Sequence, residues 1–426
     1  MKSPGTNQPG ASLLENRAYV LFILVVVYTF NFIDRQIIGI LAVPIKADLM
    51  LSDTQLGLMG GFAFALFYAG LGIPIAMLAD RSSRTWIMTI ALVLWSGMTA
   101  VCGLAQNFWQ IFLARLGVGV GEAGGVAPAW SLIADFFPPN QRARALSIYS
   151  FGIPIGSTIG IVAGGLIASA VNWRVAFFVV GAVGVLFAPI FRLTIREPER
   201  GRFDRSAGVH SAAGIGDIFR ALAGKKSFWL MSLGSAFSSM MGYALLFWLP
   251  SFFVRSYGMT LLDASLFYGA IILIGGLAGI WIGGWAADKY GQHNRSAYAM
   301  IPAIAFVTTA PMYVAGVLST SLSLTFLLML VPTALGLVWL GPVIAAIQHL
   351  VKPNMRTTAS AVFLFINNLI GIGVGTVLIG ILSDELHGRY GDDALKYSIL
   401  AGTSLYLVAA GLLFMAARYL GDDWED

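Results

Sequence analysis

Residues 19–43, YVLFILVVVYTFNFIDRQIIGILAV, decide the class of fold. About 20 apolar residues in a helix cross the roughly 30 Å hydrocarbon core of a bilayer, and this stretch is long enough to do so. The whole chain follows the same pattern, with 58% hydrophobic and 11% charged residues and a mean hydropathy of +0.79. The apolar segments show no strand-like alternation, and backbone groups in lipid must be satisfied within their own segment. The sequence therefore predicts an all-α membrane protein.

About twelve such stretches divide the chain into two sets of six, which predicts two six-helix bundles. We expect the bundles within residues 19–195 and 227–419, with cytoplasmic tails at 1–18 and 420–426 and a cytoplasmic linker at 196–226. The linker is charged, and its end, GIGDIFRALAGKK, has the composition of a short amphipathic helix on a membrane surface. The expected spans are 19–43, 54–78, 86–105, 108–134, 142–170, 173–195, 227–253, 262–287, 297–318, 321–350, 357–382 and 393–419.

Lys and Arg residues gather on one side of this topology, as is typical of cytoplasmic segments. With the N-terminus inside, the cytoplasmic segments hold about 19 of the 26 Lys and Arg residues, and the outer segments hold about five. We therefore expect a multi-pass protein of the cell (inner) membrane with both termini in the cytoplasm. The polar tail before residue 19 has no cleavage site after an apolar core, so the first span is expected to be a signal anchor.

Two short motifs recur at nearly equal intervals, which indicates an internal repeat. DRSSR at 80–84 corresponds to DKYGQHNR at 288–295, an offset of 208 residues, and PNQR at 139–142 corresponds to PNMR at 353–356, an offset of 214. Parallel halves related by an axis along the membrane normal are one known transporter architecture. Coincidence among basic loops is the alternative explanation.

These motifs resemble those of the major facilitator superfamily. Its loop signature is matched by the set Gly284, Asp288, Lys289, Gly291 and Arg295. The first copy departs from this signature, because Ala76 and Ser83 stand where two glycines are usual. Arg115 and Gly119 resemble a second motif of the family.

The span 142–170 is similar to the glycine motif of that family's antiporters, with Ile161 in place of the usual proline. Its glycines are Gly152, Gly156, Gly160, Gly164 and Gly165. Their four-residue spacing forms one smooth strip, which indicates close packing between helices. Bundles that rock against each other need such a flat seam.

A narrower resemblance, to the spinster group, rests on NFIDRQIIGIL at 31–41 and on the stretch 117–165, which begins GVGVGEAGG. The Asp-Arg pair, the Gly-Glu-Ala step and an Ile-Pro-x-Gly-Ser run carry it. The spinster group is associated with export or release of lysophospholipids and sphingosine phosphate. The resemblance therefore implies a lipid substrate, which hydropathy and spacing do not show.

Four ionisable residues lie deep in apolar spans, namely Asp34, Arg35, Arg115 and Glu122. A charge at the bilayer centre costs at least about 2.5–3.5 kcal/mol on insertion scales, so such residues usually face a cavity or a partner. The rise of a helix places Asp34 and Glu122 both near the middle of the membrane. We predict that Asp34 is the principal proton site, that Glu122 contributes, and that Arg115 serves either carboxylate as the structure moves. Arg35 is included among the proton-coupling residues, and it is expected to face a different partner or the lipid interface. A static cluster that pins two helices together is the alternative.

Other polar and aromatic residues are expected to form a cavity that is charged in its first half and aromatic and apolar in its second. They are Asn31, Tyr68, Tyr243, Tyr268, Trp339, Asn367 and Asn368. Such a cavity suits an amphiphile with a polar head, although each residue alone is better explained by packing or by an interhelical hydrogen bond. The loop residues expected to form a cytoplasmic latch are Asp80, Arg81, Arg84, Asp288, Lys289 and Arg295.

Several chemistries are not expected. The four histidines are scattered and Cys102 is the only cysteine, so the sequence shows no metal site, and it has no P-loop for ATP. An intramembrane enzyme would need a nucleophile–base pair or a metal site at one depth, and the sequence shows neither. A receptor or scaffold without transport would not need a twofold repeat with buried charges in only one half.

The sequence thus predicts a monomeric secondary transporter without a cofactor, working as a symporter or an antiporter. Its expected partners are an amphiphilic, lipid-like substrate, protons and membrane lipids, and no nucleic acid. A sugar, a drug or another small organic solute is the alternative substrate.

Overall fold

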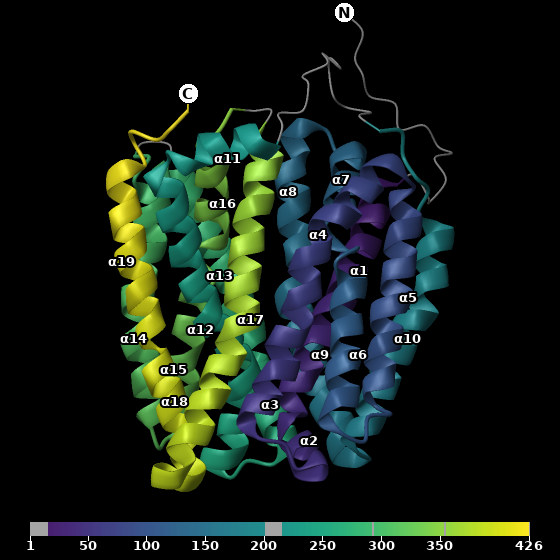
Figure 1. Cartoon of the computed structure of the whole chain (residues 1–426), viewed down its shortest axis with the longest axis vertical. Coiled ribbons are helices and arrows are strands. Elements are labelled where there is room, and N and C mark those ends of the chain that lie inside the picture. The colour runs from purple at the N-terminus through teal and green to yellow at the C-terminus, as the bar shows by residue number, and fades with distance from the viewer. Residues whose placement is uncertain (1–15, 201–214, 292–293, 353–354, 426) are drawn as a thin grey trace, which may run out of the picture.

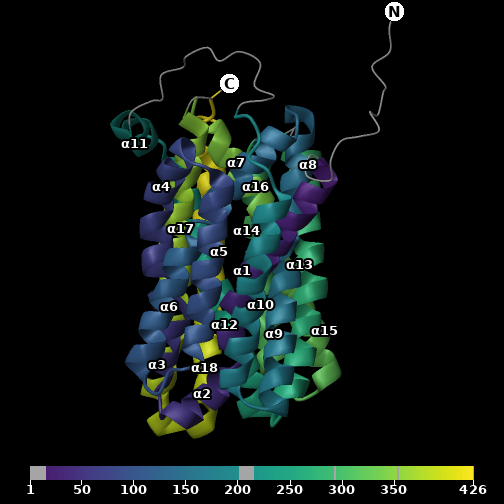
Figure 2. The same cartoon turned by 90° about the vertical axis from the view of Figure 1, so that its right-hand side faces the viewer.

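The computed structural model describes residues 16–200, 215–291, 294–352 and 355–425, and within them the chain forms helices and no strands. The helices run side by side along the long axis (Figure 1). We call the end that carries α11 (Ile215–Ala223) the linker end, and the end that carries α2 (Ala42–Leu49) the far end. α1 (Arg17–Ile40) begins at the linker end and α19 (Ser404–Tyr419) finishes there (Figures 1 and 2).

The helices form two bundles that lie next to each other, coloured from purple to teal and from teal through green to yellow in Figure 1. The first bundle contains α1, α2, α3 (Asp53–Gly57), η2 (Leu58–Phe62), α4 (Ala63–Arg81), α5 (Arg84–Cys102), α6 (Phe108–Glu122), α7 (Val126–Phe136), α8 (Pro139–Ser150), α9 (Gly152–Ala170) and α10 (Trp173–Thr194). The second contains α12 (Lys226–Tyr257), α13 (Leu261–Gly291), α14 (Ala297–Leu318), α15 (Leu322–Leu335), α16 (Leu340–His349), α17 (Arg356–Tyr390), η4 (Gly391–Asp393), α18 (Ala394–Gly402) and α19.

Ten stretches of the described chain are long and apolar enough to cross a membrane. One of them, Thr358–Tyr419, has 62 residues and covers most of α17 together with α18 and α19. The pair α6 and α7, two helices of 15 and 11 residues separated by a turn, is not among the ten. The count of twelve spans therefore stays a prediction. It would be reached if Thr358–Tyr419 were two spans and if α6 and α7 together formed one more.

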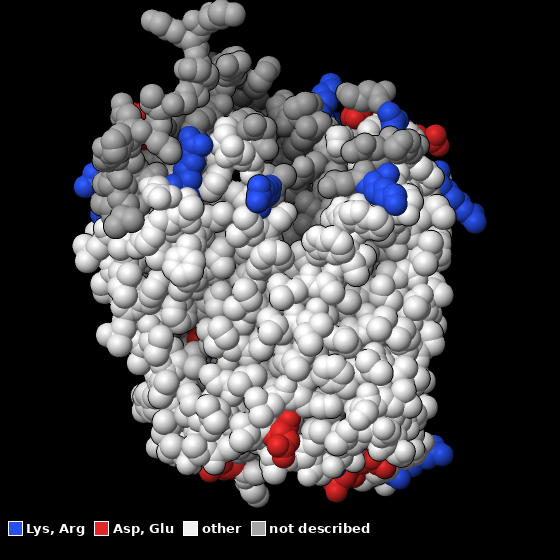
Figure 3. All heavy atoms as spheres, turned by 180° about the vertical axis from the view of Figure 1, so that it is seen from behind, with Lys and Arg blue, Asp and Glu red and all other residues white. Residues whose placement is uncertain are grey.

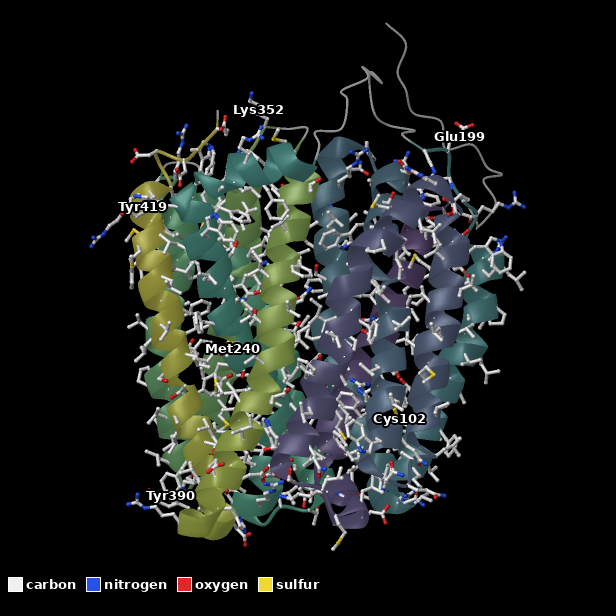
Figure 4. The ribbon with its side chains drawn as sticks, viewed as in Figure 1. Cys102, Glu199, Met240, Lys352, Tyr390 and Tyr419 are labelled. Carbon is white, nitrogen blue, oxygen red and sulfur yellow. The ribbon has the colours of Figure 1, made fainter. Side chains whose placement is uncertain are left out.

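The outer surface is that of a protein embedded in lipid. Charged residues lie near the two ends, and the wide face between them is almost entirely uncharged (Figure 3). Many large apolar side chains are exposed, with Leu186 72% exposed and Ile304 54% exposed. A soluble monomer rarely exposes so continuous an apolar surface. The chain is therefore an integral, multi-pass membrane protein. Figure 4 marks its ends, with Lys352 and Tyr419 at the linker end and Tyr390 at the far end.

The glycine strip of α9 lies in the seam between α1 and α13. A Cβ atom on Gly156 would lie 2.4 Å from the backbone oxygen of Thr29, and one on Gly160 would lie 2.7 Å from that of Ile33. On the opposite side, a Cβ atom on Gly165 would lie 2.5 Å from the side chain of Ser265 on α13. Because real Cβ atoms essentially never come this close to other atoms, a larger residue at any of these three positions would force α9 away from α1 or α13.

We expect Gly160→Leu to lower transport at least about tenfold while the protein still inserts into the membrane. The leucine side chain would overlap the α1 backbone, and overpacking of this kind costs about 1–3 kcal/mol. Flux into reconstituted vesicles, normalised to folded protein, measures the effect. Gly411→Leu is the control, because a Cβ atom on Gly411 meets nothing within 4 Å. Equal flux in the two variants would contradict a role for the seam.

Candidate functional site: a buried charge cluster between two helices

The four ionisable residues expected at midmembrane lie together in the structure. α1 carries Asp34 and Arg35, and α6 carries Arg115 and, as its last residue, Glu122. Asp34 and Arg115 are 1% exposed, and Glu122 is fully buried. We call these four residues the charge cluster.

Arg35 is the partner of Glu122. Its Nε donates a hydrogen bond of 2.6 Å to Oε2 of Glu122, which joins α1 to α6. The guanidinium carbon lies 4.6 Å from the ring centre of Phe64 and 4.5 Å from that of Tyr68, both on α4. Phe32 contributes a third ring, at 5.0 Å. Cation–π contacts of this kind strengthen when water is excluded, so the aromatic residues hold the charged head of Arg35 in place.

Asp34 and Arg115 meet differently from the sequence-based expectation. Arg115 donates a hydrogen bond of 3.1 Å to the backbone oxygen of Asp34, not to its carboxylate. The carboxylate accepts a long hydrogen bond of 3.4 Å from the hydroxyl of Ser96 on α5. Among the described residues, Oδ1 of Asp34 and Oε1 of Glu122 are buried without a hydrogen-bond partner. Each acid therefore has one carboxylate oxygen that could accept a proton or a hydrogen bond from another group.

A small cavity of about 30 Å³ lies between the bundles next to the charge cluster. Its lining residues are Arg35, Gln36, Gly60, Phe64, Arg115, Tyr243, Leu246, Phe247, Ile372 and Thr376. One water needs roughly 10–15 Å³ on this measure, so the cavity has room for one or two waters. An amphiphile would fit only after the bundles move apart.

Some of the expected cavity residues lie at this place. Tyr243 lines the cavity and Tyr68 covers Arg35. Asn31 is 2% exposed, one helical turn before Arg35, and neither of its amide atoms has a hydrogen-bond partner among the described residues. All three therefore surround the charge cluster.

The others are not part of this cavity and make contacts within the second bundle. Tyr268 donates a hydrogen bond of 3.1 Å to the backbone oxygen of Leu245, and Asn367 accepts one of 2.9 Å from Ser239. Trp339 packs edge-on against Phe363. Asn368 is half-buried on α17. Sequence analysis missed Phe64, Phe247 and Thr376, because apolar and small polar residues carry no signal of their own in a membrane span.

A second polar cluster closes the far end, and sequence analysis did not find it. Asp53, at the start of α3, receives two hydrogen bonds from Arg255 of α12, of 2.7 and 2.8 Å. Lys46 and the hydroxyl of Ser383 on α17 each donate one more, of 2.7 Å. Asp384 accepts the backbone N–H of Asp53 at 3.0 Å. We call Lys46, Asp53, Arg255, Ser383 and Asp384 the far-end cluster, and it joins the first bundle to the second.

Close backbone packing continues this closure inward. A Cβ atom on Gly57 would lie 2.5 Å from the backbone oxygen of Thr376, and one on Gly380 would lie 2.4 Å from that of Asp53. The hydroxyl of Thr376 donates to the backbone oxygen of Gly57 at 2.9 Å. α3 and η2 therefore lie directly against α17, and the far end is closed.

The expected latch residues at the linker end make contacts within their own bundles. Arg84 donates hydrogen bonds of 2.5 Å to Asp135 and 2.8 Å to Ser131, both on α7, and 2.7 Å to Glu197 after α10. Burial alone would raise the pKa of Glu197, but hydrogen bonds from the Thr85 backbone and from Arg84 outweigh it, so that this pKa is lowered. Glu197 therefore stays charged at neutral pH and holds the end of the first bundle to α5.

The other latch residues include two cations that lie over aromatic rings. Arg81 is exposed. Lys289 lies over the ring of Trp285 at 4.8 Å, and Arg295 lies over Trp424 at 5.3 Å. The side chains of Asp80 and Asp288 lie outside the described part of the chain.

Two helical bundles that bury charged residues and close against each other at one end have the architecture of a membrane transporter. The chain belongs to the Major Facilitator Superfamily, whose sequence profile matches residues 24–376. This is a family of transporters rather than enzymes, and its two bundles work by alternating access. The family and the fold expected from the sequence are thereby confirmed.

Within the superfamily the chain is spinster-like, as its motifs indicated. It is 32% identical to a bacterial homologue of the human lysosomal transporter Spinster, solved in an inward-facing and unoccupied conformation, with a TM-score of 0.87 over 96% of this chain and 98% of the other. It is 28% identical to protein spinster homolog 1 of Xenopus tropicalis, over 95% of this chain and 81% of that protein. An MFS-type efflux pump of Mycolicibacterium smegmatis is 36% identical, over 95% and 94% of the two chains.

Proposed function

We propose that this protein is a proton-coupled transporter of an amphiphilic, lipid-like solute. The observation that carries the proton coupling is the charge cluster, in which Asp34 and Glu122 are buried and each has an oxygen without a hydrogen-bond partner. A carboxylate in low dielectric resists ionisation, and a nearby guanidinium opposes that effect. Moving Arg35 or Arg115 relative to the acids would therefore change how tightly they hold a proton.

The chemistry of the cavity supports an amphiphile as the substrate. The first bundle contributes the two arginines, whereas the second contributes Leu246, Phe247 and Ile372. Two guanidinium groups suit an anionic phosphate head, because Arg pairs with phosphate through parallel hydrogen bonds. The apolar wall opposite suits a hydrocarbon tail. The likeness to spinster proteins points to the same class, lysophospholipids or sphingosine phosphate.

The closed far end is what we expect of an inward-facing stage of such a cycle if the linker end faces the cytoplasm. The excess of Lys and Arg in the segments assigned to the inside supports this orientation. The closed far end would then face the outside of the cell membrane. The protein would work as a monomer, since one chain supplies both bundles and the cavity between them.

Flux into vesicles tests the proposal. Protein reconstituted into liposomes is given a labelled lysophosphatidylethanolamine, sphingosine phosphate or glucose, with and without a pH difference of one unit across the membrane. We expect the gradient to raise flux of one of the lipids at least about threefold, and a protonophore to abolish the increase. Lipid flux that ignores the gradient would contradict proton coupling, and gradient-driven flux of glucose alone would contradict the lipid class.

A small drug-like cation or neutral compound is the second candidate, because the 36% identical relative is named an efflux pump. Ethidium added to the same vesicles provides the comparison. Gradient-driven ethidium movement without lipid movement would favour this candidate over the lipid.

A further inference from the structure

An open groove lies between α13 and α14 near the linker end, away from the cavity between the bundles. Its volume is about 310 Å³, and its lining residues are Lys289, Tyr290, Asn294, Ala297, Met300, Ile301 and Ile304. None of these residues lines the cavity beside the charge cluster. A volume above about 300 Å³ falls in the range of sites that hold small molecules.

The groove has a polar end and an apolar wall. Lys289 and the amide of Asn294 lie at the helix ends, whereas Met300 and Ile304 lie further along α14, where they are 38% and 54% exposed. The eight residues from Ala297 to Ile304 span roughly 10 Å along the helix. The groove therefore runs from the charged end of the molecule into the belt that faces hydrocarbon.

Aromatic side chains mark the depth at which the polar end sits. Trp285 and Tyr290 are 46% and 49% exposed, and the ammonium group of Lys289 lies 4.8 and 5.5 Å from their ring centres. Exposed Trp and Tyr residues are enriched at the level of lipid headgroups. Lys289 is thus positioned at the height of a lipid phosphate, and the apolar wall of the groove lies below it, toward the hydrocarbon.

We propose that this groove binds one anionic phospholipid of the surrounding leaflet, with its phosphate on Lys289 and Asn294 and an acyl chain along Met300 and Ile304. Basic pockets between membrane helices on the cytoplasmic side bind anionic headgroups in other proteins. The apolar wall distinguishes a membrane lipid from a free phosphate ion, which would gain nothing from it. The site is separate from the transport cavity and does not depend on the proposed substrate.

Native mass spectrometry of the full chain tests the site, with phosphatidylglycerol or phosphatidylcholine of matched chains added at equal concentration. We expect one phosphatidylglycerol molecule to bind in preference to phosphatidylcholine. Lys289→Gln should weaken it about fivefold, the effect of removing one lysine from a membrane surface. Ile304→Trp should weaken it by filling the groove while the charge remains, and inorganic phosphate should not displace the lipid.

Lys226→Gln is the matched control. Lys226 is also exposed near the linker end and lies over an aromatic ring, that of Tyr419 at 5.1 Å, but it does not line the groove. An equal loss in both lysine variants would mean that surface charge alone attracts the lipid. That result, equal binding of the two lipids, or full binding by Lys289→Gln would each overturn the proposal.

Discussion

Asp53→Ala is expected to open the far end of the transporter. Asp53 is 3% exposed and pairs with both nitrogens of the Arg255 fork across the two bundles. Removing one member of a buried, hydrogen-bonded charge pair costs about 2–5 kcal/mol. The substitution destabilises only the conformation in which the far end is closed. The population of molecules with an open far end should therefore rise at least about tenfold.

Spin labels across the far end measure this change. Gln106 and Asp392 are exposed residues of the first and second bundle at that end, and cysteines there, with Cys102 replaced by Ala, would carry the labels. The distance between the labels should lengthen in Asp53→Ala. Asp48→Asn is the control, because Asp48 pairs with Arg174 inside the first bundle. An unchanged distance distribution in Asp53→Ala would show that the far-end cluster does not hold the bundles together.

That the residues of the charge cluster lie at one level of the two helices could be predicted from the sequence, but their pairing could not. A helix rises regularly, so counting residues from the ends of two spans placed Asp34 and Glu122 at one level. Which arginine reaches which acid depends on how α1 and α6 cross and on the rings of α4 around Arg35. Those contacts involve residues far apart in the chain. The sequence accordingly suggested Arg115 for both acids, whereas the structure pairs Glu122 with Arg35.

The far-end cluster could not be predicted either, because it too depends on contacts between residues far apart in the chain. Lys46, Asp53 and Arg255 lie near the ends of the expected spans, where charged residues are ordinary, so their positions do not mark them as a cluster. Ser383 contacts Asp53 from 330 residues away. Tyr268 and Asn367 do not line the cavity as expected. A hydroxyl or amide group in a membrane helix can form its hydrogen bond with a neighbouring helix as readily as with a substrate. Only the ionisable residues were costly enough to bury for the sequence alone to single them out.

The charge cluster yields the prediction with the greatest consequence for mechanism. We expect Asp34→Asn to keep substrate exchange within about twofold of the parent protein while losing the response to a pH gradient. The asparagine resembles the protonated acid, so the variant should bind substrate but no longer exchange a proton as the conformation changes. Coupling requires that the two conformations hold the proton with different affinity, and an amide holds none in either. Counterflow and gradient-driven uptake in the same vesicles separate the two activities.

Replacing Arg35, unlike replacing Asp34, is expected to lower the stability of the protein as well as its proton coupling. Arg35→Gln leaves Glu122 buried without its cation, and breaking a buried pair in this way costs about 3–5 kcal/mol. The single variant should therefore fold poorly, and adding Glu122→Gln should restore thermal stability without restoring the response to a pH gradient. If the cluster were only a static clamp between α1 and α6, the double variant would recover gradient-driven transport together with stability, and Asp34→Asn would respond to the gradient like the parent. Stability that returns without coupling would identify the acids as the proton-carrying part of the cluster and Arg35 as the residue that holds Glu122 ready to ionise.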